Sequence, residues 1–314
     1  MIIATVGTGG IGGYLAVKLI KAGYKVANIA RGKHLNAIRK NGLRLKKSNI
    51  TETVTPWIST DRPENVGKVD FIIFGVKGDS LHEAADLCSD LVHSDSVIIP
   101  FLNGVEASDR LLKFFPEKNV ANGLAQVSTT VTEPGVIEQT GDFANFIFAE
   151  RDSSCSTRIK ALREAMITAG LNAPDTDDID RDLWEKFVMF SAMSGITAAA
   201  RVTLGQIIGS PNLKDLFISV MKETAELGRA YDIHLHESLE LKIWERILKL
   251  PSNVRASTAI DLEKGLPLEI EWISGAVKRL AKKVNLNVPL NSTIYALLSP
   301  YKNGQNNISF DIIQ

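Results

Sequence analysis

Two charged side chains fall inside apolar helical patterns, where charge is costly. Lys186 lies in a helix predicted to begin near Asp182, and its neighbours along that helix are apolar on every face. A desolvated ammonium has a lowered pKa, which suits it to donate a proton near neutral pH. The alternative is that Lys186 pairs with Asp182 at the exposed start of the helix.

Glu269 is the second of these charged residues. It falls within the buried arc of a helix predicted over residues 268–284. A carboxylate directed inward needs a cationic or hydrogen-bonding partner, and Lys186 is the candidate. The alternative is a first-turn acid favoured by the helix dipole. A proton donor beside a counter-charge would indicate acid–base chemistry.

A glycine-rich turn near the N-terminus is a candidate cofactor site. The turn consists of Gly7, Thr8, Gly9, Gly10, Ile11 and Gly12. It follows an apolar run, Met1–Val6, which predicts a buried strand, and precedes a predicted helix over residues 13–22. In this dinucleotide-binding pattern Gly7 allows a tight turn, Gly9 lets the backbone approach a pyrophosphate, and Gly12 permits close packing of helix on strand. The helix N-terminus offers N–H groups to the anion.

Basic residues follow the second predicted strand, Lys25–Ala30, where an NAD-specific site usually has an acid. Arg31 occupies that position, Lys33 is close by, and the chain has no acidic residue before Glu52. A guanidinium can bind a 2′-phosphate that a carboxylate would repel. The pattern predicts NADPH over NADH; otherwise both residues are ordinary solvated loop charges.

Strand-like runs alternate with helical patterns over about the first 110 residues, which predicts a doubly wound parallel sheet. The further core strands are Asp70–Val76 and Ser96–Phe101, and hairpin strands are predicted at 120–131, 135–139 and 146–149. From Leu183 onward helical periodicity dominates. We therefore expect an α/β fold with an N-terminal Rossmann-type doubly wound sheet in residues 1–174, followed by an all-α C-terminal domain in residues 175–314.

Two residues directly follow predicted core strands, at the edge where parallel sheets bind ligands. Lys77 follows the third core strand and could face the cofactor or a substrate carboxylate. Asn103 follows the fourth and could bind the nicotinamide ribose or the substrate. The alternatives are a solvated loop lysine and an Asn-Gly turn.

Composition bounds the class of protein. The chain has 314 residues, 45% of them hydrophobic, which is enough for two buried cores. Its formal net charge of zero gives no sign of nucleic-acid binding. Cys88, Cys155 and the five histidines show no ligand spacing, so neither a metal site nor a disulfide framework is expected. With no leader or long apolar run, we expect a cytoplasmic protein without a membrane span.

Taken together, these motifs resemble the ketopantoate reductase family, NADPH-dependent 2-dehydropantoate 2-reductases, over essentially the whole chain. The resemblance rests on the glycine turn with Arg31, the strand ends at Lys77 and Asn103-Gly104, Leu183-Trp184-Glu185-Lys186-Phe187, Ile196-Thr197-Ala198, and Ser257 twelve residues before Glu269. It implies NADPH-dependent reduction of a 2-oxo acid, foremost ketopantoate to pantoate in pantothenate biosynthesis. It also implies a Rossmann domain, a helical domain, an active site in the cleft between them, and a chain that could form a homodimer.

The resemblance further implies a role for each candidate residue. Lys186 would protonate the ketone oxygen as NADPH delivers hydride to the carbon. Glu269 would orient Lys186 and contact the nascent alcohol. Asn103 and Ser257 would hold the substrate, with Ser257 near its carboxylate, and Lys77 would line the cofactor side.

Two positions depart from the family pattern. Members that act on ketopantoate have Asn one and two turns beyond the catalytic lysine, whereas this chain has Phe190 and Ser194. Phe190 would make the substrate pocket more apolar, and Ser194 has a shorter reach. Lost amide donors can change substrate discrimination strongly. A paralogue that reduces a different 2-oxo acid or ketone is therefore an alternative.

There are two further alternatives, one a different kind of dehydrogenase and the other a binding protein that is not an enzyme. Dehydrogenases of the hydroxyacid or opine type more often depend on a catalytic histidine, and no histidine here lies in a motif that suggests one. An NADPH-sensing binding protein with an idle cleft would need neither Lys186 nor Glu269. NADPH binding without turnover of any 2-oxo acid would favour the sensor.

Overall fold

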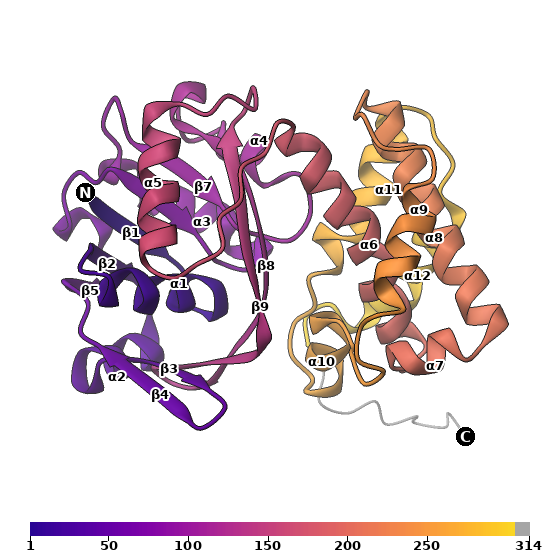
Figure 1. Ribbon diagram of the computed structural model, residues 1–314, viewed down its shortest axis with the longest axis horizontal. Helices are drawn as coiled ribbons and strands as arrows, with labels where there is room; N and C mark the ends of the chain where they lie inside the picture. Colours follow the sequence, from indigo (N-terminus) through magenta and orange to yellow (C-terminus); the bar gives the residue numbers. More distant parts are fainter. Residues whose placement is uncertain (305–314) are drawn as a thin grey trace, which may run out of the picture. The chain divides into compact units, whose positions relative to one another are not determined.

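The computed structural model describes residues 1–304, which form two compact units (Figure 1). The first unit contains Met1–Leu102 and Glu106–Asp182, and the second contains Asn103–Val105 and the chain from Leu183 onward. The predicted fold class, a parallel sheet with helices followed by an all-α region, is confirmed. The domain division expected between residues 174 and 175 stays a prediction.

A five-stranded parallel sheet forms the centre of the first unit. Its strands are β1 (Ile2–Val6), β2 (Lys25–Ile29), β5 (Ile58–Thr60), β6 (Phe71–Phe74) and β7 (Val97–Pro100), in the order β5-β2-β1-β6-β7. All four pairings are parallel, and Val6 lies beside both Ile29 and Phe74. The segments that follow β1, β2 and β6 therefore leave the sheet at one edge. Gly7, Arg31 and Lys77 lie on these segments.

A second sheet contains four strands in the order β4-β3-β9-β8. They are β3 (Leu43–Lys47), β4 (Ile50–Val54), β8 (Ala121–Glu133) and β9 (Val136–Glu150). The prediction of separate strands at 135–139 and 146–149 is wrong, because the chain continues through Gly141 and Asp142 as part of β9. Pairing with β8 continues on both sides of that point, across a register shift between Val127 and Thr129.

Helices complete the first unit. They are α1 (Gly10–Lys21), α2 (Gly32–Asn41), α3 (Leu81–Leu87), α4 (Ala107–Leu111) and α5 (Thr157–Thr168), with short 3₁₀ turns at Pro63–Asn65, Gly78–Ser80, Ser89–Leu91 and Glu117–Asn119. Helix α1 packs against β1 and β2 of the parallel sheet and against all four strands of the second sheet. It therefore contributes apolar side chains, such as Leu15 and Val17, to a core shared by both sheets.

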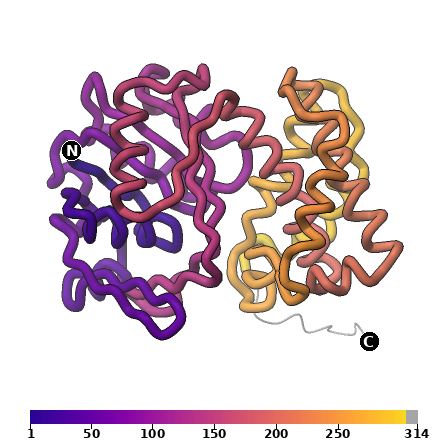
Figure 2. Tube along the Cα trace, viewed as in Figure 1, coloured from indigo at the N-terminus to yellow at the C-terminus, as the bar shows by residue number. Residues whose placement is uncertain are grey.

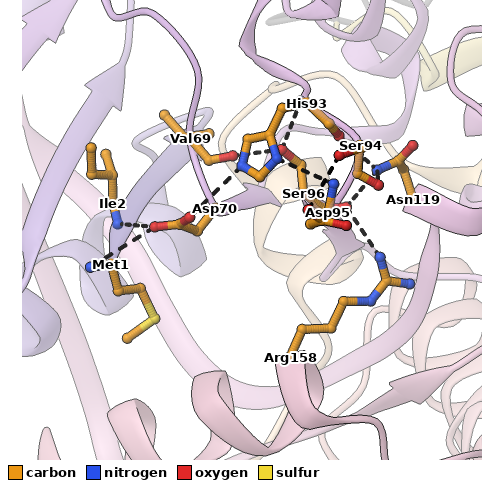
Figure 3. A network of polar contacts seen from close by, with 10 residues as sticks. All are labelled: Met1, Ile2, Val69, Asp70, His93, Ser94, Asp95, Ser96, Asn119 and Arg158. Carbon is orange, nitrogen blue, oxygen red and sulfur yellow. Dashed lines mark hydrogen bonds and ion pairs between the residues drawn. The ribbon is translucent and has the colours of Figure 1, made fainter.

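The amino ends of the parallel strands are fixed by polar contacts (Figure 3). The Asp70 carboxylate accepts a 2.7 Å hydrogen bond from the Ile2 N–H and lies 3.7 Å from Nε2 of His93. Ser96 accepts from the His93 N–H at 2.9 Å, and the Asn119 amide donates to the Ser96 carbonyl at 2.7 Å. These residues precede or begin strands, so His93 belongs to the sheet edge opposite the glycine turn.

The second unit contains helices and no strand among its described residues (Figure 2). Its helices are α6 (Ile179–Ala199, which begins in the first unit), α7 (Leu204–Ile208), α8 (Pro211–Ala230), α9 (Leu239–Ile247), α10 (Ser257–Glu263), α11 (Ser274–Lys283) and α12 (Pro289–Leu298), with 3₁₀ turns at Ile270–Trp272 and Ser299–Tyr301. Helix α8 packs against α7, α9, α11 and α12. Its Glu223 carboxylate accepts from the N–H groups of Leu290 and Asn291 and so caps α12.

Two helix predictions in this region need correction. The helix expected from near Asp182 begins at Ile179, so Asp182 lies within its first turn. The single helix expected over residues 268–284 does not form. Ile273 has a non-helical backbone (φ −117°, ψ −93°) that separates the turn Ile270–Trp272 from α11. Glu269 therefore precedes a short 3₁₀ turn and is not a first-turn residue of an α-helix.

Candidate active site

Lys186 and Glu269 are joined through a third predicted residue, Asn103. The Lys186 ammonium donates to Oδ1 of Asn103 across 3.2 Å, and Nδ2 of Asn103 donates to Oε2 of Glu269 across 3.3 Å. Because an ammonium only donates and a carboxylate only accepts, this arrangement fixes which way the amide faces. Lys186 and Glu269 are thus close together, as expected, but the Asn103 amide lies between them and bonds to both. All three residues belong to the second unit.

Gly104 makes the position of Asn103 possible. Its φ is +88°, a conformation that glycine adopts readily, and a Cβ there would lie 2.5 Å from the carbonyl oxygen of Trp272. The segment 103–105 can therefore lie against the turn that follows Glu269. The Asn-Gly pair lies at a bend of the chain, and this bend places the amide of Asn103 beside two charged groups.

The surroundings of Lys186 change its acidity. Burial lowers the pKa of the Lys186 ammonium to about 8, and the nearby Glu269 carboxylate partly opposes that shift. The alternative pairing with Asp182 is not observed, because the Asp182 carboxylate accepts from the Thr176 hydroxyl at 2.6 Å and lies near Arg181. A lysine with this pKa remains mostly protonated at neutral pH and gives up its proton more readily than an ordinary lysine.

Phe190 and Ser194 follow Lys186 at one-turn and two-turn spacing on α6. The Lys186 nitrogen lies 6.0 Å from the centre of the Phe190 ring. The Ser194 hydroxyl lies 2.6 Å from the Thr258 hydroxyl, and both side chains are buried. Ser194 is thus engaged with α10, whose first residue, Ser257, is exposed. This stretch of α6 presents an aromatic ring at the position where family members that act on ketopantoate have Asn.

The glycine turn of the first unit fits a dinucleotide. Gly7 has φ +83°, and a Cβ at Gly12 would lie 2.2 Å from the Gly7 carbonyl oxygen, so both positions require glycine. Gly9, the N-cap of α1, has open space around its Cβ position and no side chain capping the helix. No side chain caps the first N–H groups of α1, so these groups are available to bind an anion at the helix N-terminus.

Gly10 and Thr8 also contact residues outside the glycine turn. A Cβ at Gly10 would lie 2.8 Å from the carbonyl oxygen of Thr129 on β8. The buried Thr8 side chain donates to the Ile29 carbonyl at 3.3 Å, and Ile11 is partly buried against the first core. Gly10 therefore also serves the packing of the second sheet against the turn.

Arg31 has an acidic neighbour that the sequence did not suggest. Its guanidinium lies 3.1 Å from the Glu83 carboxylate of α3, and both side chains are well exposed. The sequence has no acidic residue before Glu52, but the fold brings an acid to Arg31 from 52 positions away. Exposed pairs of this kind contribute at most about 1 kcal/mol, so a phosphate can compete for the guanidinium. Lys33 and Lys77 are also exposed.

His34 is the polar residue near this turn that sequence reasoning missed. Its ring contacts the Thr8 carbonyl at 2.7 Å and the Gly135 N–H at 3.1 Å. The partners lie 26 and 101 positions away, so no local spacing could have indicated them. Within residues 1–304, no cluster of three metal-ligating side chains occurs and no helix is long and apolar enough to cross a membrane.

The glycine turn and the lysine with lowered pKa define the class, a dinucleotide-dependent oxidoreductase. Residues 3–152 match the family model of ketopantoate reductase PanE/ApbA, and residues 178–302 match the model of its C-terminal region. The chain belongs to the ketopantoate reductase family. It is therefore an NADP-dependent oxidoreductase that acts on CH–OH donors, with NADPH as cofactor and 2-oxo acid reduction as the reaction class.

Similar proteins cover almost the whole chain. The uncharacterized oxidoreductase YkpB of Bacillus subtilis is 27% identical, covering 95% of this chain and 97% of that protein. A 2-dehydropantoate 2-reductase of Mesorhizobium japonicum is 28% identical with the same coverage. The PanE/ApbA family ketopantoate reductase of Ralstonia eutropha has a TM-score of 0.87 at 26% identity, covering 96% of this chain and 98% of that chain.

A structure of D-mandelate dehydrogenase with NADH and anilino(oxo)acetate is also similar in fold. Its TM-score is 0.89 at 21% identity, and the match covers 96% of this chain and 98% of that chain. At this identity the likeness concerns the fold alone. Proteins named for different substrates, ketopantoate and D-mandelate, thus share this architecture.

Proposed function

We propose that this protein reduces a 2-oxo acid to a 2-hydroxy acid with Lys186 as the proton donor. The observation that carries the proposal is the Lys186–Asn103–Glu269 arrangement, in which a lysine of lowered pKa is held by an amide beside a carboxylate. NADPH supplies the hydride that reaches the carbonyl carbon. The glycine turn, Arg31 and Lys33 would hold the pyrophosphate and 2′-phosphate, and Lys77 would line the cofactor side.

The proton step follows from the properties of Lys186. Its Nζ carries a proton at neutral pH and transfers it to the ketone oxygen as the C–H bond forms, which leaves a 2-hydroxy acid and a neutral lysine. Water restores the proton. Glu269 favours the charged lysine electrostatically and would accept a hydrogen bond from the new hydroxyl group. Asn103 keeps the two groups at fixed separation, so the donor is aligned before reaction.

Ser257 is the proposed partner of the substrate carboxylate. It is exposed at the start of α10, and the next residue, Thr258, is fixed to Ser194 of α6. The Ser257 hydroxyl can donate to a carboxylate oxygen. If Ser257 binds the substrate carboxylate, Ser257→Ala should raise the KM for the oxo acid with little change in NADPH binding. If Ser257 serves only to begin the helix, the KM should not change.

The substrate side chain has two candidate identities. Ketopantoate, and hence a place in pantothenate biosynthesis, is the first candidate because curated relatives carry that activity in their names. The second is a 2-oxo acid with an apolar side chain. It is favoured by Phe190, whose ring neighbours Lys186, and by Ser194, whose hydroxyl is engaged with Thr258. We propose a cytoplasmic location for either, and pairing of two copies stays a prediction.

NADPH oxidation by the purified protein tests the proposal. Ketopantoate should be compared with 2-oxo acids bearing smaller, larger, unbranched and aromatic side chains. Efficient turnover of ketopantoate would support the first substrate, and turnover of apolar members alone would support the second. Tight NADPH binding without turnover of any 2-oxo acid would contradict the proposed reaction and favour a sensor.

A further inference from the structure

His34 connects the glycine turn to the hairpin of β8 and β9. It lies in the first turn of α2, three positions after Arg31. One ring nitrogen, Nε2, is 2.7 Å from the Thr8 carbonyl oxygen, and the other, Nδ1, is 3.1 Å from the Gly135 backbone nitrogen. Gly135 lies in the turn between the two long strands. Three segments far apart in sequence therefore meet at one imidazole.

The two contacts determine the protonation state of the ring. The Gly135 backbone N–H can only donate, so Nδ1 of His34 must carry a lone pair. The proton of the neutral ring is then on Nε2, where it can donate to the Thr8 carbonyl, which can only accept. Both hydrogen bonds are satisfied by this one neutral tautomer. An imidazolium would place an N–H group against the N–H of Gly135.

The Thr8 carbonyl matters because of the peptide bond to which it belongs. In a trans peptide the C=O and the following N–H point in opposite directions. A hydrogen bond that holds the Thr8 carbonyl therefore also fixes the direction of the Gly9 N–H. Gly9 is the N-cap of α1, and no side chain caps that helix end. The direction of this N–H is a property that pyrophosphate binding requires.

We propose that neutral His34 is a positioning residue for NADPH, and that protonation of its ring breaks the hydrogen bond from Gly135, displaces the ring from the Thr8 carbonyl and thereby weakens cofactor binding. This rests on the proposed seat of the cofactor at the glycine turn. His34 itself need not contact NADPH. It acts through the backbone of Thr8, with Gly135 as the fixed point on the other side.

The surroundings of His34 oppose its protonation. Burial lowers the pKa of the His34 imidazole, and the hydrogen bond to the Thr8 carbonyl partly opposes that shift. The charged groups on the neighbouring segments are Arg31 beside α2 with its partner Glu83, Lys33, Lys40 and Arg39 of α2 with Asp61 after β5, and Arg44 and Lys46 of β3 with Glu133 of β8 and Glu138 of β9. Many of these cations and acids are paired with one another, and burial is the main cause of the lowered pKa of His34. The neutral form is therefore the resting form at neutral pH.

The test is the pH dependence of the NADPH dissociation constant, measured by fluorescence titration between pH 5 and 8. His34→Gln keeps an amide that can donate to Thr8 but does not titrate. His236→Gln removes an exposed histidine of the second unit and serves as a matched control. The 2′-phosphate of NADPH titrates in all three proteins, so the comparison between them isolates the histidine.

Wild type and His236→Gln should lose about tenfold more affinity at low pH than His34→Gln, as expected for one lost hydrogen bond. Equal pH slopes in wild type and His34→Gln would overturn the inference while leaving the reductase proposal intact. Absence of NADPH binding at any pH would instead contradict the proposed cofactor seat.

A second measurement does not depend on the variants. Nitrogen-15 NMR of the wild-type protein should show the Nε2–H tautomer of His34 at neutral pH, with an acceptor shift at Nδ1. A spectrum with the proton on Nδ1 would overturn the inference, because Gly135 could not then donate to that nitrogen.

Discussion

Lys186 donates a hydrogen bond to Asn103 across 3.2 Å, although 83 positions separate the two residues. The amide oxygen accepts this hydrogen bond, and the amide nitrogen donates another to Glu269. Asn103 thus fixes the distance between a proposed proton donor and the carboxylate that stabilises its charged form. Its own position depends on Gly104, whose backbone conformation and close neighbour exclude a side chain. These contacts make the chemistry of Lys186 testable at several places.

Removal of the Lys186 ammonium should abolish the proton step and leave cofactor binding intact. We expect Lys186→Ala to lower kcat by about 10²–10⁴-fold, the usual contribution of a positioned general acid. The dissociation constant for NADPH should change little, because the proposed cofactor residues lie in the first unit. Stopped-flow assays of NADPH oxidation and fluorescence titration measure the two effects. Lys242→Ala, at an exposed position on α9, is the control, and normal turnover in Lys186→Ala would contradict the assignment.

The pH profile of reduction should report the pKa of Lys186. Reduction needs the protonated lysine, and its pKa is lowered to about 8, so kcat should fall as pH rises through about 8. Because the Glu269 carboxylate raises this pKa, Glu269→Gln should move the alkaline limb to lower pH. Initial rates between pH 6 and 10 at saturating substrate measure both profiles. An identical limb in wild type and Glu269→Gln would show that the two groups are not coupled.

Arg31 should distinguish NADPH from NADH despite its contact with Glu83. Arg31→Asp is expected to weaken NADPH binding by at least tenfold and NADH binding far less, since one charged hydrogen bond to phosphate is lost. Glu83→Gln frees the guanidinium and should strengthen NADPH binding by no more than about fivefold, because an exposed pair is worth at most about 1 kcal/mol. Titration at low and high salt measures both. Equal loss of both cofactors in Arg31→Asp would exclude Arg31 from phosphate recognition.

Phe190 should affect the preference for polar or apolar substrate side chains more directly than Ser194. Phe190→Asn places an amide one turn beyond Lys186 and should raise kcat/KM for ketopantoate relative to an apolar 2-oxo acid. Ser194→Asn must displace the buried Thr258 hydroxyl, so it should cost stability before it changes specificity. The kcat/KM ratio and the melting temperature of each variant separate these effects. An unchanged kcat/KM ratio in Phe190→Asn would show that Phe190 does not contact the substrate.

Gly104→Ala should disturb the position of Asn103 as well as stability. A non-glycine residue at positive φ costs about 1–3 kcal/mol, and here the new Cβ would also lie 2.5 Å from the Trp272 carbonyl oxygen. Gly141→Ala is the matched control, because Gly141 also has positive φ (+72°) but open space around it. Denaturant unfolding and kcat should show a larger loss for Gly104→Ala in both quantities. Equal losses in the two variants would mean that the contact with Trp272 does not matter.

Much of the fold could be predicted from local sequence. The parallel strands are short apolar runs, and the helices that follow them have recognisable periods, so the α/β region and the all-α region were both foreseen. Two predictions were wrong: β9 is one strand where two were predicted, and the single helix predicted over residues 268–284 does not form. For β9, the ladder with β8 outweighs the local turn signal. Over residues 268–284 the helix is interrupted at Ile273, beside the point where Gly104 lies against the Trp272 carbonyl.

The sequence by itself determined the glycine turn, the chemical types of the candidate site residues and the family to which the chain belongs, because those depend on residue identity and short spacing. Only the tertiary structure decided that Asn103 joins Lys186 to Glu269, that Glu83 faces Arg31, and that His34 holds the Thr8 carbonyl. These contacts link positions 26 to 166 residues apart. Hydrogen bonds act over about 3 Å, and only the packing of the whole chain brings such positions within that distance.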